Sequence, residues 1–137
     1  MADPLLDLGP LSQAVTQNIS VEVLSQYSAE NSHPQQGDWV FEYTVRITNK
    51  GSEPVQLISR HWIITDAAQE TREVKGPGVV GEQPVLAPGE SFEYSSRCPL
   101  KTPLGMMRGT YQMIRSDGEL FDIEIAPFAL KARYTVH

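Results

Sequence analysis

Apolar side chains recur at every second position from Trp39 to Ile47, and polar side chains occupy the alternate positions from Glu42 to Thr48. Successive side chains of an extended strand point to opposite faces, whereas those of a helix repeat about every 3.6 residues. The segment therefore predicts a strand with one buried face and one face in water, which is typical of an antiparallel sheet. Such a strand has to bury its apolar face against a second layer of structure.

The same period of two recurs along most of the chain and predicts a protein made of strands. The pair Asp117-Gly118 is a strong hairpin signal, and Pro127 is expected to end regular pairing. A change of phase within residues 55–66 predicts a β-bulge or burial on both faces. The expected strands cover residues 19–23, 39–49, 55–66, 71–75, 92–98, 106–115 and 119–125.

No segment has the pattern of an amphipathic helix, and the intervals between strands are too short for the crossover helices of a parallel sheet. We therefore predict an all-β fold: an antiparallel two-sheet sandwich of fibronectin type III or immunoglobulin type with about seven or eight strands. Cys98 is the single cysteine, which excludes an intramolecular disulfide and favours the fibronectin-like variant. Residues 1–18 lack periodicity and are expected to form a flexible N-terminal tail, followed by one domain over residues 19–137.

The composition excludes several classes of protein. The chain has 11 basic and 17 acidic residues, a net charge of −6, which argues against general nucleic-acid binding because that affinity comes mainly from clustered Lys and Arg. No apolar stretch approaches the roughly 18 residues of a membrane span, and the first residues have no secretory signal pattern. We therefore expect a cytoplasmic protein without membrane insertion.

Residues 76–81, Gly-Pro-Gly-Val-Val-Gly, have the G-x-G-x-x-G spacing of loops that hold phosphate. In that interpretation Gly76, Gly78 and Gly81 let backbone N–H groups approach a pyrophosphate, and Lys75 adds a positive charge. The motif normally opens a helix, which the prolines that follow here prevent. The competing interpretation is a structural loop in which glycine supplies positive φ angles. Acidic residues also crowd this loop, at Glu70, Glu73 and Glu82.

The sequence predicts neither a metal centre nor a catalytic site. The three histidines lie far apart, at His33, His61 and His137, and no spacing typical of a zinc or calcium site is present. Cys98 has the buried parity of its strand, which indicates a small apolar side chain rather than a nucleophile. We therefore expect no enzyme and no cofactor.

Leu104, Met106 and Met107 are the candidate residues for binding a protein partner. They follow a Thr-Pro pair at the start of a strand. Exposed methionines form adaptable apolar patches that accept partners. The alternative is that these side chains fill the end of the sandwich.

Several consecutive motifs resemble the ApaG domain family, and the resemblance covers roughly residues 19–137. The motifs are WIITD (62–66), GPGVVGEQPVL (76–86), PGESFEYSS (88–96), LKTPLGMM (100–107), GTYQM (109–113) and PFAL (127–130). The resemblance implies a fibronectin III-like sandwich and a bacterial, cytoplasmic protein. It also implies an association with cobalt resistance and magnesium efflux, of a genetic kind. Eukaryotic relatives carry the domain in an F-box substrate receptor and in a DNA-polymerase-delta-interacting protein, which favours protein interaction.

These observations lead to one expected function and two alternatives. We expect a non-enzymatic binding domain that presents loops or a sheet face to an unidentified protein partner, with an indirect link to cobalt and magnesium homeostasis. One alternative is a nucleotide or pyrophosphate sensor that uses Gly76, Gly78 and Gly81, onto which the family's suggested pyrophosphate motif maps. The other is a direct, weak contact with a divalent cation.

Overall fold

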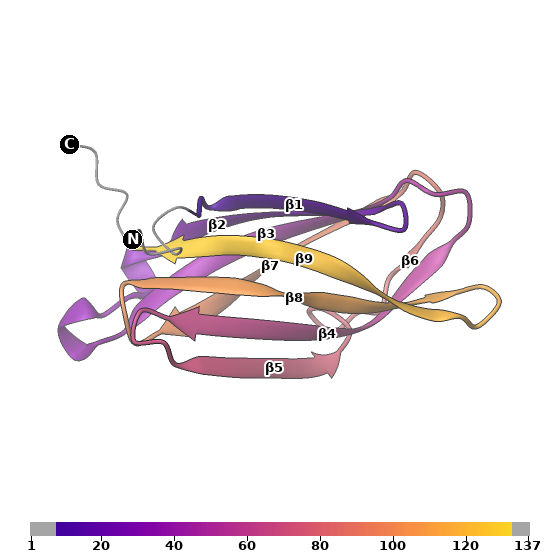
Figure 1. Ribbon diagram of the computed structural model, residues 1–137. Helices are drawn as coiled ribbons and strands as arrows, with labels where there is room; N and C mark the ends of the chain where they lie inside the picture. The colour runs from indigo at the N-terminus through magenta and orange to yellow at the C-terminus, as the bar shows by residue number, and fades with distance from the viewer. Residues whose placement is uncertain (1–7, 133–137) are drawn as a thin grey trace.

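Two antiparallel sheets face each other in the structure, a computed structural model that describes residues 8–132 (Figure 1). The described residues form nine strands and two short 3₁₀ helices, and the predicted all-β sandwich is confirmed. The strands are β1 (Leu11–Thr16), β2 (Ile19–Tyr27), β3 (Trp39–Asn49), β4 (Val55–Asp66), β5 (Thr71–Pro77), β6 (Val85–Leu86), β7 (Ser91–Leu100), β8 (Leu104–Arg115) and β9 (Leu120–Lys131). The 3₁₀ helices are η1 (Ala29–Asn31) and η2 (Pro34–Gln36). The part of the chain that the structure describes has no helix long and apolar enough to cross a membrane.

The four-stranded sheet has the order β1-β2-β3-β7, and the five-stranded sheet has the order β5-β4-β8-β9 with β6 also paired to β4. β8 pairs with β4 along its whole length, so β5 and β6 share the other side of β4. The segment between β5 and β6 holds the glycine-rich loop. This loop therefore lies at the edge of the five-stranded sheet.

The inner faces of the two sheets enclose one apolar core. The alternation predicted for β3 is confirmed, because Phe41, Val45 and Ile47 are fully buried on this face. Trp62 of β4 packs at ring-centroid distances of 5.3 to 6.2 Å against aromatic side chains of both sheets, namely Tyr43, Tyr111 and Phe128. These aromatic contacts join the sheets near their centre.

Two bulges shift the register of the five-stranded sheet. The first lies in β4 between Leu57 and Ser59, as predicted, and it changes which residues face the core. The second lies where Met107 and Gly109 of β8 face β9. The prediction that Pro127 ends regular pairing is wrong: β9 continues to Lys131. Pro127 lies in the bulge, where a residue without an N–H group costs no ladder hydrogen bond.

Part of the predicted N-terminal tail is a strand, β1, in the structure. Leu11–Thr16 pairs with β2, so the expectation of a flexible segment is wrong for these residues, whereas residues 1–7 lie outside the described part of the chain. The turn between β1 and β2 contains Gln17 and Asn18, with φ of 47° and 67°. Positive φ at both central residues matches a type I′ turn, whose twist suits a two-residue hairpin.

The two flanks of the sandwich differ. On one flank β9 lies beside β1 and β2 (Figure 1). Ala129 N–H donates to the Gly9 carbonyl at 2.8 Å, Ser25 Oγ donates to the Ala129 carbonyl at 2.6 Å, and Glu124 N–H donates to Thr16 Oγ1 at 3.1 Å. On the opposite side β5 and β7 are the last strands of their sheets. We call the side bounded by β5 and β7 the open flank.

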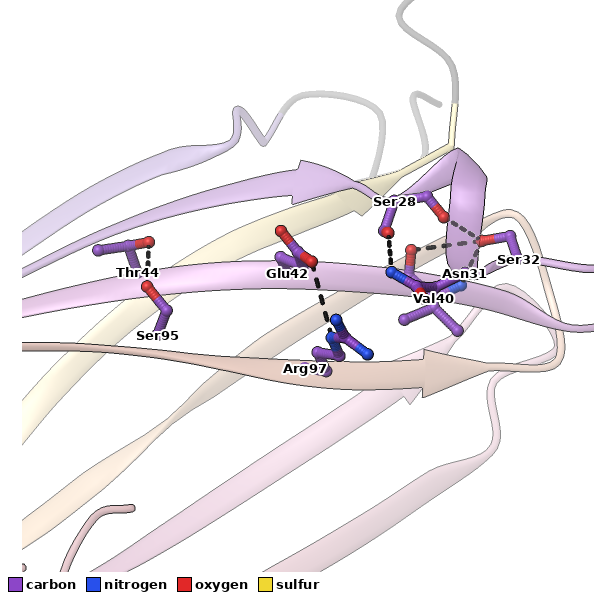
Figure 2. A network of polar contacts seen from close by, with 8 residues as sticks. All are labelled: Ser28, Asn31, Ser32, Val40, Glu42, Thr44, Ser95 and Arg97. Carbon is purple, nitrogen blue, oxygen red and sulfur yellow. Dashed lines mark hydrogen bonds and ion pairs between the residues drawn. The ribbon is translucent and has the colours of Figure 1, made fainter.

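Over β3 and β7 the outer face of the four-stranded sheet is polar (Figure 2). Ser32 anchors the loop after β2, because its Oγ donates to the Ser28 carbonyl at 2.7 Å and accepts from Val40 N–H at 2.8 Å. Further along, β3 and β7 are linked by two exposed cross-strand pairs, Glu42–Arg97 and Thr44–Ser95. Such solvated pairs add little stability, so the part of this face over β3 and β7 is an ordinary polar surface.

Candidate functional site

Two arginines point between the sheets at the open flank. In the register of β4 and β5, Arg60 lies opposite Gly76 and Arg72 lies opposite Ile64. Trp62 and Ile64 share the parity of Arg60 on β4 and are buried. Because alternate residues of a strand share a face, Arg60 and Arg72 belong to the inner face.

The Arg60 guanidinium holds the end of β5. Its Nη1 donates to the carbonyl oxygens of Pro77 and Gly78, both at 2.9 Å. A Cβ placed on Gly76 would lie 3.0 Å from Arg60 Nη2 and 3.1 Å from Cζ. Gly76 therefore makes room for the guanidinium, which is a structural reason for the first glycine of the motif.

The glycine-rich loop closes as a tight hairpin turn. Val79 N–H donates to the Glu82 carbonyl at 2.8 Å, and Glu82 N–H donates to the Val79 carbonyl at 2.9 Å. Val80 and Gly81 lie between them with φ of 43° and 82°, as a type I′ turn requires. The third glycine of the motif thus occupies a position where φ is positive.

Gly78 has a steric role as well. Its φ is +59°, and a Cβ at this position would come within 2.3 Å of the Glu82 carbonyl oxygen. Its N–H donates to the Ile58 carbonyl at 2.8 Å. An anion cradle needs successive N–H groups that point to one centre, but the N–H groups of Gly78, Val79 and Glu82 point to carbonyl oxygens.

The predicted phosphate ligands are only partly brought together. Gly76, Gly78 and Gly81 lie along one loop, but Lys75 lies opposite His61 in the register and has the parity of the outer face of the sheet. Its ammonium group is therefore directed away from the side on which Arg60 lies. Phosphate binding by these four residues stays a prediction.

A pocket of about 350 Å³ lies between the glycine loop and β7. We call it the Arg60 pocket, and its lining residues are Tyr43, Arg60, Pro77, Val79, Val80, Gly81, Tyr94 and Ser96. Arg60 is the one residue of this lining with a full charge at neutral pH, and no carboxylate is among them. Below the pocket the hydroxyl groups of Tyr94 and Tyr111 hydrogen-bond to each other.

Burial keeps the tyrosines of this region protonated. Desolvation raises the pKa of Tyr94, of Tyr111 and of Tyr43, and the positive charge of Arg60 lowers each pKa by a smaller amount. A neutral phenol can donate a hydrogen bond, whereas a phenolate would neutralise Arg60. The pocket therefore combines one cation with neutral hydroxyl groups.

A smaller hollow of about 150 Å³ lies further along the open flank, beside Arg72. Arg72 Nη2 donates to the Pro99 carbonyl of β7 at 2.5 Å and so spans the two edge strands. Cys98 lies nearby and is 2% exposed, which confirms the prediction of a small buried side chain. Burial raises the pKa of the Cys98 thiol, while Arg72 acts in the opposite direction.

The predicted partner-binding residues are separated by the sheet. Met107 is 1% exposed and packs in the core, so it is not available to a partner. Leu104 and Met106 alternate with it along β8 and are partly exposed. A partner-binding role for Leu104 and Met106 stays a prediction.

The histidines are engaged in other contacts or lie outside the described residues. The backbone of His33 forms a β-bridge with that of Asp38, and the Asp38 carboxylate pairs with Lys101 at 2.6 Å. His61 Nε2 lies 2.6 Å from Glu73 Oε1 on the outer face, and His137 is not described. Within residues 8–132 no three His, Cys, Asp or Glu side chains are placed to hold a metal ion together.

The sequence reasoning missed Arg60, Tyr43, Tyr94 and Ser96 as site residues. A signal was available in Arg60, which is a charged residue with the same parity as buried Trp62 and Ile64. An inward charge in an apolar strand indicates either a buried pair or a ligand contact. The other residues of the pocket come from different strands and are joined to Arg60 by the fold.

Comparison with known proteins gives consistent results. A sequence model described as the ApaG domain matches residues 29–115. The chain is 55% identical over 120 residues to "Protein ApaG" of Bordetella pertussis, covering 88% of this chain and 92% of the relative. It is 58% identical over 120 residues to "Protein ApaG" of Anaeromyxobacter dehalogenans, covering 88% and 94%. A crystal structure of a Bordetella pertussis protein described as ApaA superposes with a TM-score of 0.83 at 52% identity, covering 93% of this chain and 99% of that one.

Proposed function

Because the chain belongs to the ApaG domain family, we propose that it is a non-enzymatic binding module that takes a protein partner at the open flank. The observation that carries this proposal is the pairing of the sheets. β5 and β7 each have one neighbouring strand, and between them lie the Arg60 pocket and the smaller hollow beside Arg72.

An edge strand offers unpaired backbone N–H and C=O groups to a partner's extended segment. β5 is a poor edge for such pairing, because it carries Lys75 and ends at Pro77, which has no N–H group. β7 is the better edge before Pro99, which has no N–H group and whose carbonyl accepts from Arg72. A partner strand beside β7 would cover Val74, whose side chain faces the inner side of β5 and is 39% exposed.

Site-specific photocrosslinking in the source cells tests this proposal. A photoreactive phenylalanine at Val74 should give a discrete protein adduct, identified by mass spectrometry. The matched control places the same residue at Val15, which is 57% exposed on β1 at the far flank. Adducts at Val15 but not at Val74 would place the interface elsewhere. Robust hydrolysis of nucleotides or dinucleoside polyphosphates by the purified protein would contradict a non-enzymatic role.

The link to cobalt and magnesium would run through the partner. The pairing of His61 with Glu73 and of Asp38 with Lys101 uses groups that a direct cation site would need. Added Mg²⁺ or Co²⁺ should therefore change the yield of the adduct at Val74 but not the identity of the crosslinked protein. Saturable heats of cation binding to the purified chain would favour direct binding instead.

A nucleotide or pyrophosphate sensor has less support. The N–H groups of Gly78, Val79 and Glu82 are occupied, and a phosphate chain would find one inward cation in the Arg60 pocket. The sensor requires shifts of the amide resonances from Gly76 to Glu82 on titration with a nucleotide. If these resonances do not shift at millimolar nucleotide, the sensor hypothesis is excluded.

A further inference from the structure

Arg60 is a partly buried cation without an anion. Its Nη1 is held by two carbonyl oxygens, while Nε and Nη2 have no acceptor among residues 8–132. The ion pairs found in this part of the chain also do not include Arg60. Nε and Nη2 form one edge of the guanidinium, with parallel N–H groups that match the two oxygens of a carboxylate.

The groups around Arg60 add hydrogen-bond donors but no negative charge. Tyr94 lines the pocket and is 7% exposed, whereas Tyr111 is fully buried. When Tyr111 donates to Tyr94, the Tyr94 proton is free to turn toward a group in the pocket. Ser96, two residues along β7, places a second hydroxyl in the lining, beside the hydroxyl of Tyr43 to which it also hydrogen-bonds.

The position of Tyr94 and Ser96 in β7 indicates what kind of group could enter the pocket. Tyr94 and Ser96 lie in the middle of the strand, which runs from Ser91 to Leu100. A segment paired with β7 would therefore continue past the pocket in both directions. Because alternate side chains of such a segment face inward, an internal side chain would enter the pocket rather than a chain terminus.

We propose that the Arg60 pocket receives the carboxylate of an Asp or Glu side chain from an extended segment of the protein partner, an inference that rests on the proposed function. Charge complementarity supports a carboxylate in particular. One free guanidinium edge suits one carboxylate. A phosphate group would call for the loop N–H groups, three of which donate to carbonyls, and for Lys75, which has the parity of the outer face.

Titration with short peptides followed by ¹H–¹⁵N NMR tests the proposal directly. The probes are acetyl-Val-Thr-Glu-Thr-Val-amide, the same peptide with Gln in place of Glu, and inorganic phosphate. The Glu peptide should shift the Arg60 Nε–Hε resonance and the amide resonances of Val80 and Gly81 in a saturable way. The Gln peptide should bind at least about tenfold more weakly, because it loses a charge-assisted bidentate pair.

Variants locate the binding. Arg60→Gln should weaken the Glu peptide at least about tenfold, whereas the matched control Arg46→Gln, at an exposed arginine on the outer face of β3, should leave its affinity unchanged. Arg60 also holds the glycine loop, so Tyr94→Phe and Ser96→Ala provide a test that keeps Arg60 in place. Each of these two variants should weaken the Glu peptide several-fold while the spectrum stays folded.

Four results would overturn the proposal: equal affinity for the Glu and Gln peptides, tighter binding of phosphate than of the Glu peptide, loss of binding in Arg46→Gln but not in Arg60→Gln, or full affinity in both hydroxyl variants. Failure here is distinguishable from failure of the proposed function. Adducts at Val74 that persist in Arg60→Gln would keep protein binding at the open flank and remove carboxylate recognition. Absence of adducts at Val74 would remove the proposed protein binding at the open flank itself.

Discussion

Three tyrosine hydroxyls, from Tyr43, Tyr94 and Tyr111, are buried close to Arg60 where the two sheets meet. A hydroxyl removed from water is stable when it has a hydrogen-bond partner, and Tyr94 and Tyr111 serve as partners for each other. Ionisation of any of the three would place a phenolate in an apolar layer. The positive charge of Arg60 offsets the cost of such a phenolate only in part, since desolvation keeps the pKa of each tyrosine raised.

This burial predicts loss of stability at high pH. A tyrosine in the unfolded chain has a pKa near about 10, and the raised pKa in the folded state keeps the group protonated there. Each such tyrosine therefore contributes stability below pH about 10 that is lost above it, at roughly 1.4 kcal/mol per pH unit. Urea unfolding from pH 8 to 11 should show a falling midpoint.

The matched variant for this prediction is Tyr94→Phe, which removes one of the three ionisable groups. It should make the fall of the unfolding free energy above pH about 10 less steep. Cys98 also has a pKa raised by burial, so its thiol adds a loss that begins at lower pH, and Cys98→Ala removes that part. A midpoint that stays constant up to pH 11 would contradict the burial of these groups.

At the level of elements, the Asn49 side chain ties two segments to the end of β3. Its side chain is fully buried. Nδ2 donates to the carbonyls of Glu53 at 2.7 Å and Leu86 at 3.0 Å, and Oδ1 accepts from Gly51 N–H at 2.9 Å. One side chain thus holds the turn after β3 and the short strand β6.

Asn49→Ala should destabilise the protein by about 2–4 kcal/mol, because it leaves the carbonyls of Leu86 and Glu53 without these donors and opens a cavity. The measurement is the free energy of unfolding in urea. The neighbouring control Thr48→Ala removes only an exposed hydroxyl pair with Ser91 and should cost less than about 1 kcal/mol. Similar losses in both variants would show that the buried amide network does not support this end of the sandwich.

The strands that were predicted from the sequence are those in which alternate apolar side chains face the core. β3 and the hairpin at Asp117-Gly118 are confirmed for this reason. β1 breaks the rule: Leu11 and Val15 are 66% and 57% exposed, and the alternate inward positions hold small or polar side chains, namely Ser12, Ala14 and Thr16. Alternation could not reveal a strand whose apolar side chains face water.

The candidate site could not be predicted from the sequence for a related reason. The glycine spacing directed attention to backbone N–H groups, but those groups take part in the turn itself. The Arg60 pocket combines residues of β3, β4 and β7 with the glycine loop, and this combination depends on the sheet order. Local pattern identifies strands, whereas a site between strands requires their pairing.

For the whole molecule, the difference between the two flanks follows from β1. This strand lies against β9 and supplies the Thr16 Oγ1 acceptor, and the chain just before it supplies the carbonyls of Gly9 and Pro10. The acceptors satisfy N–H groups of β2 and β9. The sandwich is therefore closed on one side, and on its other side β5 and β7 remain the last strands of their sheets.

Removal of β1 should thus damage the fold beyond the loss of one short strand. A chain that begins at Asn18 should unfold about 10 °C lower than one that begins at Leu8, because several backbone donors lose acceptors, each worth about 1 kcal/mol, and a domain of this size shifts by roughly 3–5 °C per kcal/mol. The exposed edge of β2 should also promote association, visible by light scattering. The control Val15→Thr, which changes an outward side chain but keeps β1, should shift the midpoint by less than about 2 °C. Equal midpoints for the two truncated chains would return the domain boundary to Ile19, as the alternation pattern alone predicts.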